Sequence, residues 1–399
     1  MSIRFKNLQV LAFIFALYHF PATSGELDLS GYARVIGGYL DEKSVEYRGY
    51  DDSLSFSPSS LLGLQADYYF NDKWSATAQG LLRSDNTTVS GESGLEWLYL
   101  TYTPTDRLQI KAGKLRTPFF TMSDFSDVGF AYPWINPPQQ VYDTYLFKTF
   151  NGIDAIYKFG SESFDVSLEG YYGEEASSIG IGTFKTGIEV DNLIGAIAKV
   201  NIENIEFRIS RYNANIKLDL KSIDQFQDVL NSFNFNKSAD TLHTYGGAHA
   251  EQFGVIYDNL DYFLRGEWVK IKTELDIIPT IQSYYFTVGY NNAPFTYHLT
   301  FADSDVEINS IQDEIPLGVS ADLDQLAFAY QSVFNESAPD SLKTWTIGIR
   351  WDALPNLALK AELSTLEGKD VYNSFFITSD NISFDRKTNL YLIGLDWVF

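Results

Sequence analysis

The chain has 399 residues, no cysteine and a formal net charge of −23 at pH 7. The absence of cysteine excludes disulfides and thiolate metal sites, and the acidic charge disfavours nucleic-acid partners because it repels phosphates. Tyr and Phe supply 26 and 30 residues, whereas Met supplies two. This aromatic excess is typical of membrane barrels, which carry aromatic girdles at both interfaces, and not of globular cores.

Residues 1–24 have the features of a secretory signal peptide. Arg4 and Lys6 form a basic start, an apolar run covers 8–20, and small residues surround a cleavage site near Ser24. The alternative is an uncleaved membrane anchor, but an apolar run of this length is too short to span a bilayer as a helix. We therefore predict a mature domain covering 25–399, exported from the cytoplasm.

The mature region contains alternating apolar and polar stretches whose period of two predicts β-strands. The predicted strands lie near 27–40, 62–68, 74–80, 95–103, 108–112, 152–159, 164–172, 192–200, 205–212, 252–257, 262–271, 283–290, 295–302, 343–351, 357–364 and 388–399.

The connections between these strands alternate in length. Every second one is a short turn of Asn, Asp, Pro or Gly, and the others, such as 173–191, are long, polar and acidic. This parity predicts an all-β, antiparallel up-and-down transmembrane barrel of about sixteen strands, with short turns at one end and long loops at the other. A soluble sandwich or propeller is the alternative, but it would require cores on the faces that carry Trp and Tyr near the strand ends.

Two of the long connections have apolar residues at helical spacing. They lie at 220–230 and 323–334, where apolar residues recur every three or four positions. We predict short helices that pack over the barrel mouth, in preference to helices that bind a partner.

The last predicted strand is apolar on one face, which carries Tyr391, Ile393, Leu395, Trp397 and Phe399. In this pattern the chain resembles Gram-negative outer-membrane β-barrels, whose closing strand ends in Phe with apolar residues at alternate positions. The resemblance implies that these five residues close the barrel and carry the signal for the barrel assembly machinery.

Residues 114–150 form a long connection rich in aromatic residues and prolines. Prolines stiffen a segment and aromatic side chains need burial, so we expect it to pack inside the barrel. As the third long loop after the fifth strand, it resembles the constriction loop of sixteen-stranded general porins, although the Pro-Glu-Phe-Gly-Gly signature of that family is absent. The candidate constriction residues are Asp124, Asp127, Tyr132, Trp134 and Asp143.

Basic residues are predicted to line the pore wall opposite these loop residues. They are Arg34, Lys111, Lys114, Arg116, Arg350 and Lys360. Because the last three strands neighbour the first in a closed barrel, Arg34, Arg350 and Lys360 should form one basic wall. Acidic loop residues facing that wall across water would create a transverse field that selects solutes by charge and polarity. The alternative is that these charges are paired structural ions.

The porin resemblance implies a homotrimer in the cell outer membrane, in contact with lipids and lipopolysaccharide. We predict passive diffusion of small hydrophilic solutes, without cofactor, metal or catalysis. Beyond the signal the histidines His243, His249 and His298 have no recognisable ligand spacing, and His298 is predicted to face the lumen alone. Two alternatives remain: a channel selective for sugars or other organic solutes, and a non-conducting surface adhesin or receptor.

Overall fold

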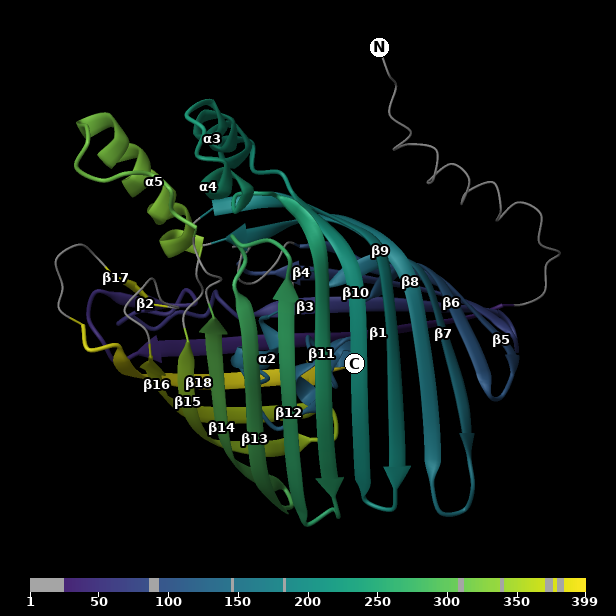
Figure 1. Ribbon diagram of the computed structural model, residues 1–399. Helices are drawn as coiled ribbons and strands as arrows, with labels where there is room; N and C mark the ends of the chain where they lie inside the picture. Colours follow the sequence, from purple (N-terminus) through teal and green to yellow (C-terminus); the bar gives the residue numbers. More distant parts are fainter. Residues whose placement is uncertain are drawn as a thin grey trace.

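The computed structural model describes residues 25–85, 93–144, 147–181, 184–307, 312–337, 341–369, 376–378 and 384–399. Sixteen of the strands in this part of the chain form one closed antiparallel barrel (Figure 1), which confirms the predicted fold class. In chain order they are β1 (Glu26–Leu40), β3 (Leu61–Asn71), β4 (Trp74–Arg83), β5 (Gly94–Thr105), β6 (Leu108–Arg116), β7 (Thr149–Gly160), β8 (Asp165–Ile181), β9 (Phe184–Ile202), β10 (Ile205–Leu218), β11 (Tyr245–Asp258), β12 (Tyr262–Thr273), β13 (Thr280–Asn292), β14 (Phe295–Glu307), β15 (Leu342–Leu354), β16 (Leu357–Gly368) and β18 (Lys387–Val398). The predicted signal peptide lies outside the described residues.

The barrel closes between its first and last strands, as the sequence predicted. β1 pairs with β3 on one side and with β18 on the other, in a register that places Tyr32 opposite Val398 and Leu40 opposite Leu390. Closure leaves no unpaired strand edge in the wall, which a sheet in contact with lipid requires.

The two faces of β18 differ in exposure as its alternation predicts. Tyr391, Ile393, Trp397 and Phe399 are 42–54% exposed on the outer face, and Leu392 on the inner face is 5% exposed. Because side chains alternate across a strand, apolar residues on the outer face form a band around the barrel while the inner face packs against the contents of the lumen.

Short turns occupy one end of the barrel, called the turn end here, and the longer connections lie at the other end, the loop end. The predicted long connection 173–191 is wrong: β8 and β9 extend to Ile181 and Phe184 and remain paired almost to their tips. The pairing register shifts between Gly173 and Glu175, as at a β-bulge. This shift interrupts the alternation of side chains by which the strand would have been predicted. The strands therefore project beyond the apolar band.

Additional elements gather at the loop end (Figure 1). The predicted helices are present as α3 (Lys221–Ser232) and α5 (Ala321–Ser337), with α4 (Asn236–Asp240) beside α3. A two-stranded sheet joins the first and last loops through β2 (Val45–Tyr47) and β17 (Phe376–Thr378), which the sequence did not predict. Across the described residues, none of the helices combines the length and apolar character needed to cross a bilayer.

Candidate functional site: the loop inside the barrel

The segment between β6 and β7, called the inner loop here (residues 117–148), folds into the barrel. It contains the short helices η2 (Ser123–Phe125), η3 (Gly129–Ala131) and α2 (Gln139–Tyr142), and α2 lies between the barrel walls in Figure 1. Tyr132 and Trp134 are each 1% exposed. The inner loop is therefore a packed element with its own core, in agreement with its aromatic and proline content.

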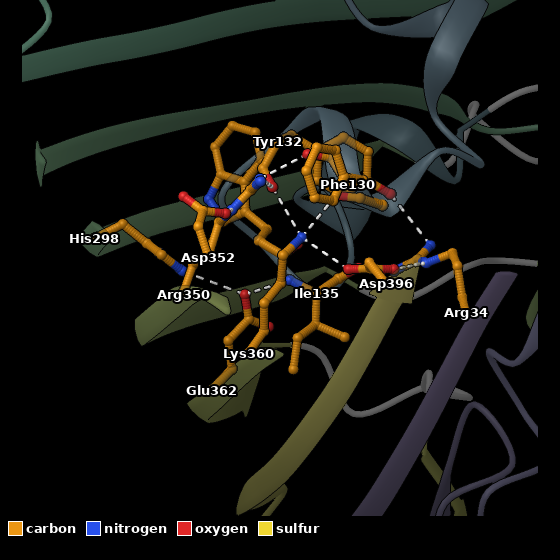
Figure 2. A network of polar contacts seen from close by, with 12 residues as sticks. Arg34, Phe130, Tyr132, Ile135, His298, Arg350, Asp352, Lys360, Glu362 and Asp396 are labelled. Atoms are coloured by element: carbon orange, nitrogen blue, oxygen red, sulfur yellow. Dashed lines mark hydrogen bonds and ion pairs between the residues drawn. The ribbon is translucent and has the colours of Figure 1, made fainter. Parts of the chain in front are cut away.

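Lys360 on β16 is the main attachment of the inner loop to one wall. Its ammonium donates to the carbonyl oxygens of Gly129, Tyr132 and Trp134 at 2.6, 2.8 and 2.6 Å, and it lies 3.0 Å from the Asp396 carboxylate (Figure 2). An ammonium has three donors and no acceptor, so these partners use its full capacity. The lysine side chain is buried, and its charge acts on the loop backbone.

Arg34 on β1 holds the inner loop beside Lys360. Its Nε donates to Asp396 Oδ1 at 2.8 Å, and its two terminal nitrogens donate to the Tyr132 hydroxyl and the Ile135 carbonyl. Gly129 lies directly against this ion pair: a Cβ there would stand 2.1 Å from Asp396 Oδ1 and 2.5 Å from Arg34 Nε. Only glycine allows the loop backbone to approach so closely.

Arg350 on β15 is the third residue of the predicted basic wall, and it also donates hydrogen bonds to the backbone of the inner loop. Its Nη1 donates to the carbonyls of Phe130 and Tyr132 at 2.6 and 3.1 Å, while Nε donates to Asp352 at 2.8 Å. The structure thus brings Arg34, Arg350 and Lys360 together as the sequence suggested. It corrects the expectation of water between them and the loop: backbone carbonyls need donors inside the lumen, and these cations supply them.

His298 on β14 is not alone in the lumen, which corrects a second expectation. Its Nε2 lies 3.4 Å from Glu362 Oε1, and the same carboxylate oxygen accepts a 2.7 Å hydrogen bond from the Ile135 amide. The ring of Trp134 packs edge-on to His298, and the indole Nε1 donates to Thr300 Oγ1 at 2.9 Å. These contacts fix the middle of the inner loop against β14 and β16.

Glu267 on β12 anchors the loop to a second part of the wall, four strands from β16 in the barrel order. Its carboxylate accepts hydrogen bonds from the Thr121 amide at 2.9 Å, the Tyr142 hydroxyl at 2.6 Å and the Gln252 side chain at 2.9 Å. The two arms of the loop, represented by Thr121 and Tyr142, therefore meet on one carboxylate.

Arg208 on β10 holds the first residues of the loop. Its guanidinium donates to the carbonyls of Pro118 and Phe119 and to the side chain of Gln252. Hydrogen bonds to charged groups are about twice as strong as neutral ones, so anchors of this kind specify the path of the backbone. The inner loop is thus clamped between two walls of the barrel.

Asp127 of the inner loop faces one of the predicted basic residues, Arg116, and also Arg83, which was not predicted. It accepts hydrogen bonds from Arg116 Nη1 at 2.6 Å and from Arg83 Nη2 at 3.2 Å, while Arg116 lies 3.6 Å from Glu96. Burial alone would raise the pKa of Asp127, but Arg116 and Arg83 hold that pKa well below its ordinary value. The carboxylate therefore keeps its charge at neutral and mildly acidic pH.

Asp143 forms an ion pair with Arg48 of the first loop, and the Tyr47 hydroxyl donates to Gln139 Oε1 at 2.8 Å. The first loop therefore rests on the inner loop. Burial raises the pKa of the Tyr47 hydroxyl, so it remains a donor at all ordinary pH values. These two contacts join the first loop, at β2, to the second arm of the inner loop.

The remaining predicted residues lie apart from these clusters. Asp124 is exposed on the inner loop, and Lys111 faces inward with its ammonium 5.6 Å from the centre of the Tyr99 ring. Lys114 shares the face of Ala112 and donates to the Leu95 carbonyl at 2.8 Å. The prediction that Lys114 lines the pore is therefore not supported, because strand alternation carries it to the outer face.

A cavity of about 120 Å³ lies beside the inner loop at the loop end. Its charged lining consists of Arg34, Arg48, Arg83, Arg116, Lys148, Asp127 and Asp143. Both carboxylates are held by arginines, so the cavity keeps an excess of positive charge in a strongly acidic chain. Burial lowers the pKa of Lys148, and its ammonium has no hydrogen-bond or ion-pair partner among the described residues.

The Asp127→Asn variant should destabilise the barrel and make the cavity more basic. Removing the carboxylate leaves Arg83 and Arg116 buried without their shared partner, at a cost of about 3–5 kcal/mol. The measurements are thermal unfolding in detergent and reversal potential in a bilayer. Asp143→Asn is the control because that carboxylate is one-third exposed and should cost about 1 kcal/mol or less. Equal losses in both variants would contradict this assignment.

Several residues of this site were missed from the sequence. Asp396 and Glu362 lie on inward positions of strands that were predicted, so alternation would have placed them in the lumen. Arg83 and Lys148 lie at strand ends, where alternation gives no direction. Gly129 carried no local signal, because the ion pair it contacts is made by residues far away in the chain.

Neither a protein-family model nor a curated protein sequence matches this chain. Solved structures do match it in fold. An anion-selective porin from Comamonas acidovorans has a TM-score of 0.57 at 14% identity, over 94% of this chain and 100% of that one. The channel DcaP of Acinetobacter baumannii scores 0.56 at 13% identity (95% and 99%), and OmpT of Vibrio cholerae scores 0.55 at 12% identity (95% and 99%).

Proposed function

We propose that this chain, which has the fold of the sixteen-stranded outer-membrane porins, forms a channel in the outer membrane for passive diffusion of small hydrophilic solutes. The observation that carries this function is the basic cavity beside the inner loop, inside a barrel whose outer face is apolar. Lumen charges next to a narrowing select permeating ions by sign. The channel therefore favours anions over cations.

The lining of this cavity is positively charged, although the chain as a whole is negatively charged. The five basic residues around it include Lys148, whose ammonium forms no ion pair in the described part of the chain and interacts with Asp127 and Asp143 only at longer range. The acidic residues of the inner loop are either held by arginines, as Asp127 and Asp143 are, or exposed elsewhere, as Asp124 is. A barrel of this fold supports such a preference, since one similar structure is an anion-selective porin.

The test of this function is conductance in a planar bilayer under a KCl gradient. The native protein should give ohmic currents and a reversal potential on the anion side. Lys148→Gln should shift that potential toward cations, because a unit charge about 7 Å from an ion in water contributes about 0.6 kcal/mol, or about a threefold change in local ion concentration. Lys148→Glu should shift it further.

Arg107→Gln is the matched control, because Arg107 is exposed in a turn at the far end of the barrel. It removes the same charge from the chain without changing the cavity. Folded barrels that carry no current would contradict the channel function. Currents with equal shifts in both variants would contradict only the role of the cavity.

We also propose a homotrimer whose final strand directs assembly. The similar OmpT structure has been obtained in a trimer form. The exposed face of β18, including Trp397 and Phe399, offers the alternating apolar pattern expected of an assembly signal. Chemical cross-linking of the native protein in membranes measures the number of subunits, and replacing Phe399 by Ser should reduce the amount of inserted barrel.

A further inference from the structure

Two carboxyl side chains meet on the inner face of β7 and β8, nearer the turn end than the basic cavity. Asp154 on β7 pairs with Tyr171 on β8, and Glu169 stands two residues further along β8, opposite Ile156. Residues two apart on a strand share a face, so both carboxyl groups point into the barrel. Their side chains are in hydrogen-bond contact. Asp154 and Glu169 are called the carboxyl pair here.

The carboxyl pair has no basic partner that would compensate two negative charges. Asp154 is 4% exposed, and its Oδ2 accepts no hydrogen bond in the described part of the chain. Lys111 on β6 stands opposite Asp154, but its ammonium lies over the Tyr99 ring and forms no ion pair with either carboxyl among the described residues. Two carboxylates in contact at a buried site repel each other, and they form a hydrogen bond only when one of them carries a proton.

Charged residues of four other elements act on the carboxyl pair. They are Lys111 on β6, Asp124 on the inner loop, Lys199 on β9 and Arg208 on β10. The phenol of Tyr171 faces the pair as well, and phenols stay uncharged below about pH 10. Arg208 is already bonded to carbonyls of the inner loop.

The protonation state of the carboxyl pair therefore decides the local charge of the lumen. With one proton, the pair carries a single negative charge, and together with Asp124 it balances the two ammonium groups of Lys111 and Lys199. Without that proton, the same group of side chains has an excess of one negative charge.

We propose that Asp154 and Glu169 share one proton at neutral pH and release it at alkaline pH, and that this proton sets the ion preference of the channel. The effect on ion preference rests on the proposed channel function, whereas the shared proton does not. While the proton is bound, the basic cavity alone determines the preference for anions. After its release, the added negative charge lowers the local anion concentration about threefold for an ion about 7 Å away in water. Asp154 and Glu169 are thus specificity-determining residues.

The test compares the reversal potential under a KCl gradient at about pH 7 and about pH 9, below the range in which exposed lysines lose their charge. Asp154→Asn and Glu169→Gln should each leave the potential at pH 7 unchanged, because the remaining carboxylate keeps the single charge and the new amide donates to it. At pH 9 the potential of the native protein should lie further toward the cation side than that of either variant. Other groups that titrate in this range are the same in all three proteins, so the difference isolates the carboxyl pair.

Asp124→Asn is the matched control, because Asp124 is a single exposed carboxylate of the same group. Its removal should shift the potential toward the anion side at both pH values. The proposal is overturned if Asp154→Asn and Glu169→Gln behave like Asp124→Asn at pH 7, or if they keep the full alkaline shift of the native protein.

Infrared spectroscopy of the folded barrel detects the shared proton without any current. The native protein at pH 7 should show a C=O band of a protonated carboxyl group that is lost at pH 9 and is absent from both variants. Folded native barrels that carry no current but show this band would contradict the channel function only. Identical carboxyl bands in the native protein and both variants would overturn the shared proton.

Discussion

Replacing Lys360 by Met should release the inner loop from one wall and destabilise the molecule strongly. The substitution keeps an unbranched apolar stem and removes the ammonium that holds the carbonyls of Gly129, Tyr132 and Trp134. Three buried carbonyls then lack their donor and Asp396 loses one of its two cations. Breaking a buried pair in this way costs about 3–5 kcal/mol.

The functional result of Lys360→Met should be a larger and noisier single-channel current. The barrel wall itself is held by strand pairing that does not involve the ammonium, so the closed sheet should persist. Bilayer recordings measure the current, and thermal unfolding measures the stability. Lys387→Met on β18 is the control because its pair with Glu367 spans 4.0 Å and is half exposed. An unchanged current with unchanged unfolding would show that other contacts fix the loop.

Replacing Arg208 by Met should free the start of the inner loop from the second part of the wall. The guanidinium is 2% exposed and supplies donors to the carbonyls of Pro118 and Phe119. Leaving such buried acceptors unsatisfied costs about 1–3 kcal/mol each. The current should rise, but less than in Lys360→Met, because Glu267 still holds both arms of the loop on that side.

The combined Arg208→Met and Lys360→Met variant should give the largest current. The two residues lie on β10 and β16, separated by five strands in the barrel order, and share no partner. Their effects on the free energy of unfolding should therefore add to within about 0.5 kcal/mol. Lys217→Met, an exposed lysine on β10, is the control for a lost charge on that strand. Strong non-additivity would mean that the loop leaves one wall only when it leaves the other.

The two walls explain why this inner loop differs from a simple constriction. Each wall contributes charged side chains. The inner loop contacts them through its backbone carbonyls and amides and not through oppositely charged side chains. Two of its acidic residues form ion pairs with other cations: Asp127 with Arg83 and Arg116, and Asp143 with Arg48. The loop acids and the basic wall therefore do not form two facing rows of opposite charge.

Local patterns in the amino-acid sequence are sufficient to predict the barrel. The period of two, the alternation of turns and loops and the apolar face of β18 are local signals, because each depends on residues that are neighbours along one strand or one turn. The same alternation placed Arg34, Arg350 and Lys360 on the inner face, and closure made their strands neighbours. It failed at β8 and β9, where a bulge interrupts the period without ending the strands.

The contacts of those inward charges, in contrast, depend on how distant parts of the folded chain meet. Lys360 meets the carbonyl of Gly129 across 231 positions of chain, and Arg34 meets Asp396 across 362. The path of the inner loop sets these partners, and that path depends on the summed packing of its aromatic side chains and on every donor available in the lumen. Local sequence patterns contain no information about contacts between residues so far apart in the chain. The basic residues could therefore be placed on the inner face of the wall, but their partners could not be predicted.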